Sequence, residues 1–124
     1  MRITENFSLS EFDCKDGSEL PIALLPNVLD LADNLQVLRD YLGVPISINS
    51  AYRSLEYNRK IGGSSTKSQH LFAKAADIVV ESKTPDEVAN IIKYLISEGK
   101  MVQGGLKAYK TFTHYDIRGY KARW

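Results

Sequence analysis

The 124 residues predict an α+β protein built from a small antiparallel sheet flanked by helices. Helical periodicity occurs in two separate segments, whereas strand-like alternation occurs in short segments around them. The last two alternating segments, residues 106–109 and 112–118, are joined by a tight Lys110-Thr111 connection and predict a β-hairpin. Because no internal repeat, linker or low-complexity segment interrupts the chain, residues 1–124 are expected to form a single domain.

Two amphipathic helices are predicted from their apolar spacing and their end signals. Residues 26–42 repeat apolar side chains every three or four positions, and Gly43 fits the position that closes a helix. The second helix begins after Thr84, which is followed by a proline and by Glu87, its partner in a capping box. Gly99 is expected to end this helix. The apolar faces consist of Val28, Leu31, Ala32, Leu35 and Leu38 in the first helix and of Val88, Ile91, Ile92, Leu95 and Ile96 in the second.

The other segments connect these helices to the strands. Residues 1–25 are expected to form an irregular arm that packs onto the body through Phe7 and Phe12, with Ser8 or Ser10 capping a helical turn. In chain order, the remaining segments predict a strand at 45–53, a short helix at 54–61, an exposed glycine- and serine-rich loop at 62–69, a buried strand at 75–80 and a basic, aromatic end at 120–124.

Composition and charge argue against several classes of partner. Sixteen basic and 15 acidic side chains give a formal net charge of +1, so bulk electrostatics cannot hold nucleic acid or an anionic membrane surface. No segment reaches the apolar length of a membrane span, and residues 1–6 lack the apolar run of a signal peptide. The sequence therefore predicts a protein that is cytoplasmic as synthesised, with no membrane insertion and no nucleic acid partner. The single cysteine, Cys14, cannot form an internal disulfide, and a buried hydrophobic position is favoured over a role as a fourth metal ligand.

The two histidines of the chain, His70 and His114, are the candidate metal ligands. Asp77 lies seven residues after His70, and a loop that leads into a strand can bring both side chains to one centre. His114 and Asp116 are two residues apart on a predicted strand, so their side chains leave the same face. Two imidazoles and one carboxylate form a ligand set that catalytic zinc uses when its fourth position is open for water. Isolated histidines are more often surface or core residues, and spacing alone leaves that alternative open.

Three separated blocks carry a further pattern: Ser-Ala-Tyr-Arg-Ser at 50–54, the serine, histidine and aspartate of 68–77, and His-Tyr-Asp at 114–116. In order and spacing they resemble the D-Ala-D-Ala carboxypeptidase family of zinc peptidases, over about residues 45–118. That family includes phage endolysins and shares its fold with the hedgehog signalling domain, so a hedgehog/DD-peptidase-like fold is implied. Residues 6–12 are also similar to the start of phage-type members, and the chain resembles the short single-domain branch of phages and prophages most.

The resemblance implies roles for individual residues. His70, Asp77 and His114 correspond to the ligands of one zinc ion per chain, which activates water and polarises the scissile carbonyl. Arg53 corresponds to the family arginine that stabilises the carbonyl oxygen or a substrate carboxylate, with a surface salt bridge as the alternative. The expected substrate-binding residues are Arg53, Ser68, Gln69 and Tyr115, with a simple turn role as the alternative for Ser68.

Two positions depart from the family pattern. Many relatives have glycine where this chain has Ala73, and alanine costs about 1 kcal/mol there if φ must be positive. Well-studied relatives carry a catalytic carboxylate three residues before the second histidine, where this chain has Thr111, and a hydroxyl cannot replace a carboxylate as a base. The short branch more often has a His-x-Asp pattern, which favours Asp116 as the general base; the alternative role of Asp116 is to orient His114. Arg118 could meet a substrate carboxylate or pair with Asp116.

The resemblance implies a zinc metallopeptidase that hydrolyses peptide bonds of the peptidoglycan stem, as a D,D-carboxypeptidase or an endopeptidase of the endolysin kind. Its expected partner is the stem peptide, its expected state is a monomer, and it would act on the cell wall after release from the cytoplasm, as phage-encoded lysis enzymes do. The alternative is a non-catalytic, zinc-containing module of the same fold that binds the cell wall or forms part of a virion. The hedgehog branch and the threonine at position 111 motivate this alternative.

Overall fold

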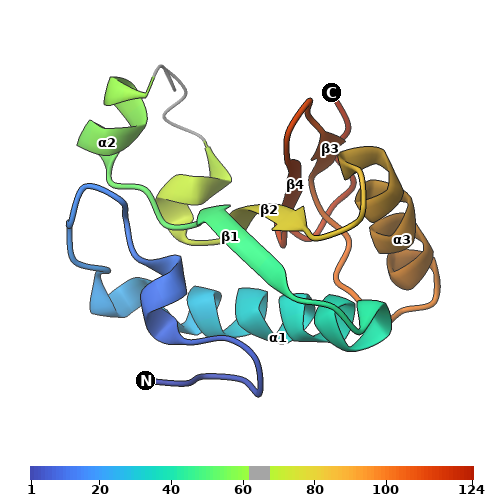
Figure 1. Ribbon diagram of the computed structural model, residues 1–124. Helices are drawn as coiled ribbons and strands as arrows, with labels where there is room; N and C mark the ends of the chain where they lie inside the picture. Colours follow the sequence, from blue (N-terminus) through green and yellow to red (C-terminus); the bar gives the residue numbers. More distant parts are fainter. Residues whose placement is uncertain (62–67) are drawn as a thin grey trace.

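Four strands form one antiparallel sheet in the order β1-β2-β4-β3 in the computed structural model, which describes residues 1–61 and 68–124 (Figure 1). The inner strands β2 and β4 pair with each other, so side chains at their centre are flanked by backbone on both sides. This arrangement confirms the predicted α+β class with a small antiparallel sheet. The strands are β1 (Ile46–Ser50), β2 (Ala75–Val80), β3 (Leu106–Ala108) and β4 (Thr113–Asp116).

Helices cover the sheet on one side and at one end. Figure 1 shows α1 running along one side of the sheet and α3 beside its β3–β4 end. The expected helix ends are confirmed: Gly43 has φ 71° after α1, Thr84 caps α3 within a capping box, and Gly99 has φ 72° just beyond α3. The helices are α1 (Leu25–Leu42), α2 (Leu55–Lys60) and α3 (Pro85–Ser97), with 3₁₀ turns η1 (Leu9–Phe12), η2 (Ile22–Leu24) and η3 (Gln69–Phe72).

The hydrophobic core lies between the helices and the sheet. The predicted apolar face of α1 is fully buried, and the N-terminal arm adds Phe7 and Phe12, whose rings meet edge to face. Burying a side chain of this size stabilises the fold by about 1.5–3 kcal/mol. Phe7 and Phe12 thus belong to the core, and Ser8 caps η1 in a capping box with Glu11.

Three predicted segments differ from the structure in their limits. The strand predicted at 45–53 ends at Ser50, because its register against β2 shifts between Ile48 and Ser50 and the chain then leaves the sheet. The strands predicted at 106–109 and 112–118 are shorter, but the Lys110-Thr111 connection is confirmed by a hydrogen bond from the Tyr109 N–H to the carbonyl of residue 112. A loop is predicted at 62–69, and its residues 62–67 lie outside the part of the chain that the structure describes. No helix in the described part of the chain is long and apolar enough to cross a membrane.

Candidate metal centre

A tight turn brings His70 from η3 to the start of β2. The Ser68 hydroxyl accepts a hydrogen bond of 3.3 Å from the His70 N–H and caps the turn. Ala73 then adopts the left-handed conformation, with φ 57° and ψ 32°, and its N–H donates to the His70 carbonyl. A residue with a Cβ is strained there by about 1 kcal/mol, which explains why glycine suits this position. The requirement for positive φ at Ala73 is thus confirmed.

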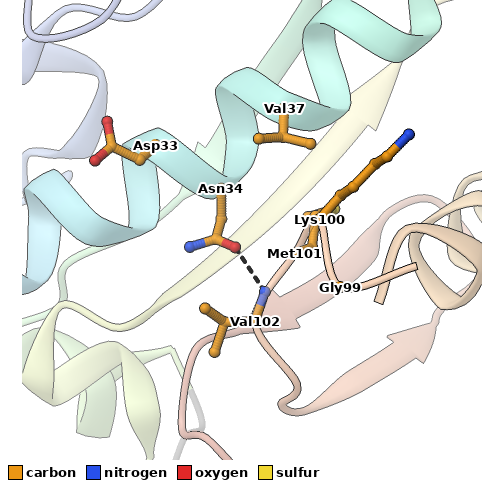
Figure 2. A pocket seen from close by; sticks show the side chains of 7 residues that line it. All are labelled: Asp33, Asn34, Val37, Gly99, Lys100, Met101 and Val102. Atoms are coloured by element: carbon orange, nitrogen blue, oxygen red, sulfur yellow. Dashed lines mark hydrogen bonds between the residues drawn. The ribbon is translucent and has the colours of Figure 1, made fainter. Parts of the chain in front are cut away.

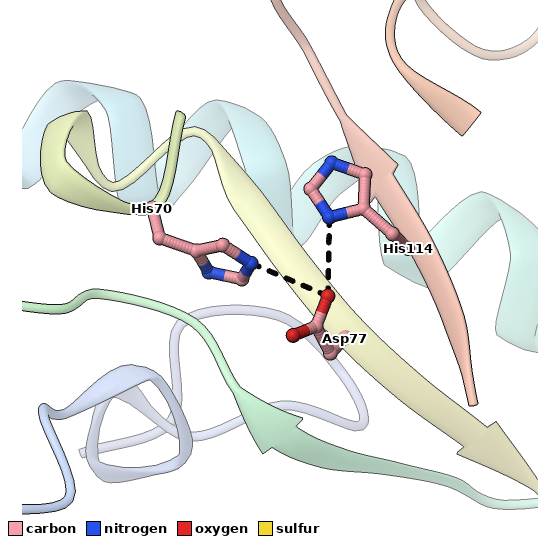
Figure 3. A group of neighbouring side chains, drawn as sticks. All are labelled: His70, Asp77 and His114. Atoms are coloured by element: carbon pink, nitrogen blue, oxygen red, sulfur yellow. Dashed lines mark hydrogen bonds and ion pairs between the residues drawn. The ribbon is translucent and has the colours of Figure 1, made fainter. Parts of the chain in front are cut away.

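Strand register brings the second and third ligands together. Asp77 on β2 and His114 on β4 are direct cross-strand partners, and such pairs present their side chains on the same face of a sheet. Figure 3 shows the His70 imidazole reaching the same carboxylate from η3. One ligand atom from each of His70, Asp77 and His114 lies within 4.8 Å of the others, and all three residues are buried. The structure therefore brings together the three residues that the sequence predicts as metal ligands.

The two nitrogens of His70 have different environments. Nδ1 lies 2.7 Å from the carbonyl oxygen of Ala51, just after β1. Because a carbonyl oxygen can only accept, Nδ1 is the nitrogen that donates to it, and the ring is thereby turned with Nε2 toward Asp77. Nε2 lies 3.2 Å from Oδ1 of Asp77 and faces the group of three. A backbone carbonyl that fixes the second nitrogen in this way is the usual support of a metal-bound histidine.

The two oxygens of Asp77 are divided between the imidazoles and Arg53. Oδ1 lies 3.2 Å from His70 Nε2 and 3.1 Å from His114 Nδ1. Oδ2 accepts a hydrogen bond of 2.9 Å from the guanidinium of Arg53. Burial disfavours the charged carboxylate, but the hydrogen bonds from His114 and His70 outweigh it and keep the pKa of Asp77 well below its usual value. Asp77 therefore stays ionised, as a ligand must be.

Arg53 lies at the metal group rather than on the open surface. Its Nε donates to the Ser50 hydroxyl at 2.9 Å, and its side chain is 16% exposed. The predicted alternative of a surface salt bridge is therefore replaced by a largely buried pair with Asp77, a candidate metal ligand. Its backbone N–H also donates to the His70 carbonyl at 3.0 Å, which ties the segment after β1 to η3.

His114 is held between two carboxylates. Nδ1 faces Asp77, while Nε2 lies 2.7 Å from Oδ2 of Asp116. Burial opposes a charged imidazole, but the hydrogen bonds to Asp116 and Asp77 prevail and raise the pKa of His114. Nε2 can donate to Asp116 while Nδ1 serves a metal, an arrangement that fixes the ring and increases its basicity.

The surroundings of Asp116 argue against its expected role as the general base. Asp116 is 0% exposed, and both oxygens are occupied. Oδ1 accepts from the Gly105 N–H at 2.8 Å, and Arg118 donates to both oxygens at 2.8 and 2.7 Å. Despite burial, which favours the neutral acid, the hydrogen bonds from Arg118 and His114 lower the pKa of Asp116. The geometry matches the alternative role, in which Asp116 orients His114, and Arg118 pairs with it.

The predicted substrate-binding residues are placed differently from one another. Tyr115 is 0% exposed, and its hydroxyl donates to the Val102 carbonyl at 2.6 Å. This burial contradicts the expectation of a substrate contact, because successive strand residues point to opposite faces and Tyr115 faces the core. Ser68 caps η3, as its alternative role predicts, and Gln69 is partly exposed beside His70. Cys14 is buried and forms no disulfide, so its predicted hydrophobic position is confirmed.

The pocket drawn in Figure 2 is not lined by any of the three candidate metal ligands. It has a volume of about 320 Å³ and lies between α1 and residues 99–102. The Asn34 side chain at its wall accepts a hydrogen bond of 2.8 Å from the Val102 N–H and a second one, of 3.3 Å, from the Tyr115 hydroxyl. Through these contacts Asn34 joins α1 to Tyr115 on β4. The wall of the pocket therefore supports β4, the strand that carries His114.

Two features of the site are missed by reasoning from the sequence. Gly105 approaches Asp116 so closely that a Cβ at position 105 would lie 2.1 Å from Oδ2. Trp124 packs its ring against His114, with centroids 5.1 Å apart. The paired glycines at 104–105 are a signal of close backbone approach that could have been used. Nothing in the sequence indicates that the segment at 120–124 returns to the metal group.

The donor set and its surroundings fit a zinc ion. Two imidazole nitrogens and one carboxylate oxygen converge, and His70, Asp77 and His114 each have their other polar atom held by a neighbour. The sheet carries a candidate metal centre whose residues match the ligand set of zinc hydrolases. The family model described as Peptidase M15 matches residues 5–116, and the chain belongs to that family.

Membership of this family confirms the resemblance to D-Ala-D-Ala carboxypeptidase-like zinc peptidases. It supports a zinc peptidase of the peptidoglycan-hydrolase kind. A comparison with curated proteins found no match.

Proposed function

We propose that this protein is a zinc-dependent peptidase that hydrolyses peptide bonds of the peptidoglycan stem. The observation that carries the proposal is the buried group of His70, Asp77 and His114, with one ligand atom of each within 4.8 Å of the others. One zinc ion bound there would supply an activated water and a polarised carbonyl. Family membership supports the reaction class, amide hydrolysis by a metallopeptidase.

The surrounding side chains have distinct tasks in this proposal. Arg53 holds Oδ2 of Asp77, so that Oδ1 stays turned toward the two imidazoles. Its exposed edge is suited to receive the carbonyl oxygen or a carboxylate of the substrate, because a guanidinium remains charged and offers several donors. Asp116 keeps the proton on Nε2 of His114 and thereby leaves Nδ1 free of it. Gln69, partly exposed beside His70, is proposed to contact substrate.

The resemblance to phage lysis enzymes supports a more specific proposal for substrate and location. The partner is the stem peptide, cleaved by a D,D-carboxypeptidase or an endopeptidase activity. The protein acts as a monomer on the cell wall, after release from the cytoplasm in which it is made. The same resemblance supports, as part of this proposal, a phage or prophage origin.

Two observations favour a second candidate function, a non-catalytic zinc module that binds the cell wall or serves as a virion part. Asp116 is enclosed by Arg118, Gly105 and His114, and the family position of the catalytic carboxylate holds the exposed Thr111. A protein that keeps its zinc ligands but has no free carboxylate to act as general base would retain the fold and the metal. It would not hydrolyse peptide bonds.

Purified cell wall separates the two functions. We expect the zinc-loaded wild type to release new peptide termini, and a His70→Ala variant that cannot hold the metal to release none. Mass spectrometry of defined muropeptides then identifies the bond. A zinc-loaded wild type that sediments with the wall and releases no termini would overturn the peptidase proposal in favour of the binding module.

A further inference from the structure

Four side chains on the β4 side of the metal group form a closed circuit of contacts. The rings of Trp124 and His114 meet edge to face, with centroids 5.1 Å apart and an interplanar angle of 69°. The guanidinium carbon of Arg118 lies 5.5 Å from the centre of the Trp124 ring. Arg118 donates to both oxygens of Asp116, and Asp116 Oδ2 meets Nε2 of His114 at 2.7 Å. The Trp124 indole thus completes a ring of contacts that begins and ends at the His114 imidazole.

The two residues before Trp124 are held to the glycine pair and to β3, through the Ala122 backbone and the Arg123 side chain. Ala122 forms a parallel bridge with Gly105, just before β3, and its carbonyl accepts from the Leu106 N–H at 3.1 Å. The neighbouring Arg123 donates to the Gly104 carbonyl at 2.7 Å. The glycine pair that approaches Asp116 therefore also anchors the segment that carries the tryptophan.

The exposure of Trp124 and the burial of its neighbours indicate that the indole shields the contact between His114 and Asp116. Trp124 remains 52% exposed, so burial of its own apolar surface explains its placement only in part. Its neighbours His114 and Asp116 are buried, and the hydrogen bond between them is closed off from solvent. A hydrogen bond to a charged group strengthens in such a low-dielectric environment, and an aromatic wall helps to keep water from it.

We propose that Trp124 is a positioning residue of the metal centre, which with Arg118 fixes the His114 imidazole with Nε2 on Asp116 and Nδ1 toward Asp77. This role rests on the proposed function, in which Nδ1 of His114 binds zinc. Rotation of the ring by half a turn would put carbon atoms where both nitrogens now lie and would break both contacts. The indole ring and the Asp116 carboxylate both contact the imidazole and oppose that rotation.

Zinc affinity, measured by chelator competition, tests the role. Trp124→Ala is expected to weaken zinc binding about tenfold, the scale seen when a residue behind a ligand is lost. Trp124→Phe keeps an aromatic ring and is expected to retain most of the affinity. Tyr109→Phe is the matched control: it removes the hydrogen bond of 3.0 Å from Trp124 Nε1 to the Tyr109 hydroxyl and leaves the contact with His114.

Nuclear magnetic resonance of metal-free protein gives a second readout, because two-bond proton–nitrogen spectra show which nitrogen of His114 carries a proton and how well the ring is ordered. We expect one ordered ring that holds a proton on Nε2 against Asp116 in the wild type, and broadened signals in Trp124→Ala. Unchanged affinity and spectra in folded Trp124→Ala, or an equal loss in Tyr109→Phe, would overturn the role. If Trp124→Ala does not fold, Trp124→Leu, which keeps apolar bulk without a ring, takes its place. A wild type that binds no zinc would contradict the proposed function, while the His114 spectra would still decide the role of Trp124.

Discussion

Gly105 donates its N–H to Oδ1 of Asp116 at 2.8 Å, and a Cβ at position 105 would lie only 2.1 Å from Oδ2 of the same carboxylate. Gly104 lies just as close to the backbone of Asp116, since a Cβ at position 104 would lie 1.8 Å from the Asp116 carbonyl oxygen. The backbone at 104–105 therefore defines where the Asp116 carboxylate can be, and with it the orientation of His114. Gly104 and Gly105 thus support His114, a candidate metal ligand, indirectly: they fix Asp116, and Asp116 contacts the His114 ring.

Gly105→Ala is expected to displace the Asp116 carboxylate. The added methyl has no space, so the free energy of unfolding should fall by about 1–3 kcal/mol. Zinc affinity should fall about 10- to 100-fold, because His114 loses its fixed partner. Urea denaturation and zinc titration measure the two effects.

Gly43→Ala is the control for that variant. Position 43 has φ 71°, and a Cβ added there would meet no atom within 4 Å. Only backbone strain of about 1 kcal/mol is therefore expected, with unchanged zinc affinity. Wild-type zinc affinity in Gly105→Ala would show that the glycine does not position Asp116.

Asp116→Asn distinguishes an orienting carboxylate from a general base. We expect zinc affinity to fall about 10- to 100-fold, because the amide is a weaker partner for His114 Nε2. At saturating zinc, kcat should change little, whereas loss of a general base lowers it by about 10²- to 10⁴-fold. The control Thr111→Ala, at the exposed position before β4, should alter neither quantity. A drop in kcat with zinc fully bound would restore Asp116 to the base role.

Local signals predicted most of the fold correctly because they act within a few residues. Thr84 and Glu87 satisfy the free N–H groups at the start of α3, and Gly43 supplies the left-handed end of α1, so both helix limits follow from short-range chemistry. The end of β1 at Ser50 is different, because it depends on a register shift against β2. Such a shift is a property of two strands together, and one segment does not reveal it.

The candidate ligand set could be predicted from the sequence, whereas the contacts around it could not. Strand alternation places His114 and Asp116 on one face, and the same rule places Tyr115 on the other, so its burial could have been predicted from the sequence. The role of Asp116 depends on Arg118 and on the approach of Gly105, which are tertiary contacts. Family resemblance identifies residue types at positions, and it does not show which oxygen or nitrogen each neighbour occupies.

Zinc binding is expected to occur once per chain and to require His70. His70→Ala should abolish stoichiometric zinc, measured by atomic emission on dialysed protein, while Gln69→Ala on the same turn should keep it. Chelation of the wild type should lower its free energy of unfolding by about 4 kcal/mol if free zinc was present at about 1,000 times its dissociation constant. Unchanged metal content in His70→Ala would exclude the proposed ligand set.

Ser82→Gly is expected to stabilise the protein. Ser82 is exposed and has φ 69° in the turn between β2 and α3, a conformation that strains residues with a Cβ. Removing the strain should raise the free energy of unfolding by about 0.5–1 kcal/mol, after the greater flexibility of glycine in the unfolded chain is included. Ala73→Gly should gain less, because it also removes a buried methyl group worth about 0.8 kcal/mol. Urea denaturation would contradict this account if Ser82→Gly were less stable than the wild type.

Arg53→Lys separates two tasks of one side chain. Arg53 contacts Asp77 Oδ2 and the Ser50 hydroxyl at 2.9 Å each through different nitrogens, and a lysine can offer only a single charged group in place of this fork. Loss of the orienting contact to Asp77 should weaken zinc binding about tenfold, the scale of one hydrogen bond to a charged group. If the guanidinium also receives substrate, kcat/KM measured at saturating zinc should fall as well, since the lysine cannot serve both partners. The control Arg59→Lys, on α2, should change neither value. A lower kcat/KM with wild-type zinc affinity would assign Arg53 to substrate alone, and two unchanged values would remove it from the site.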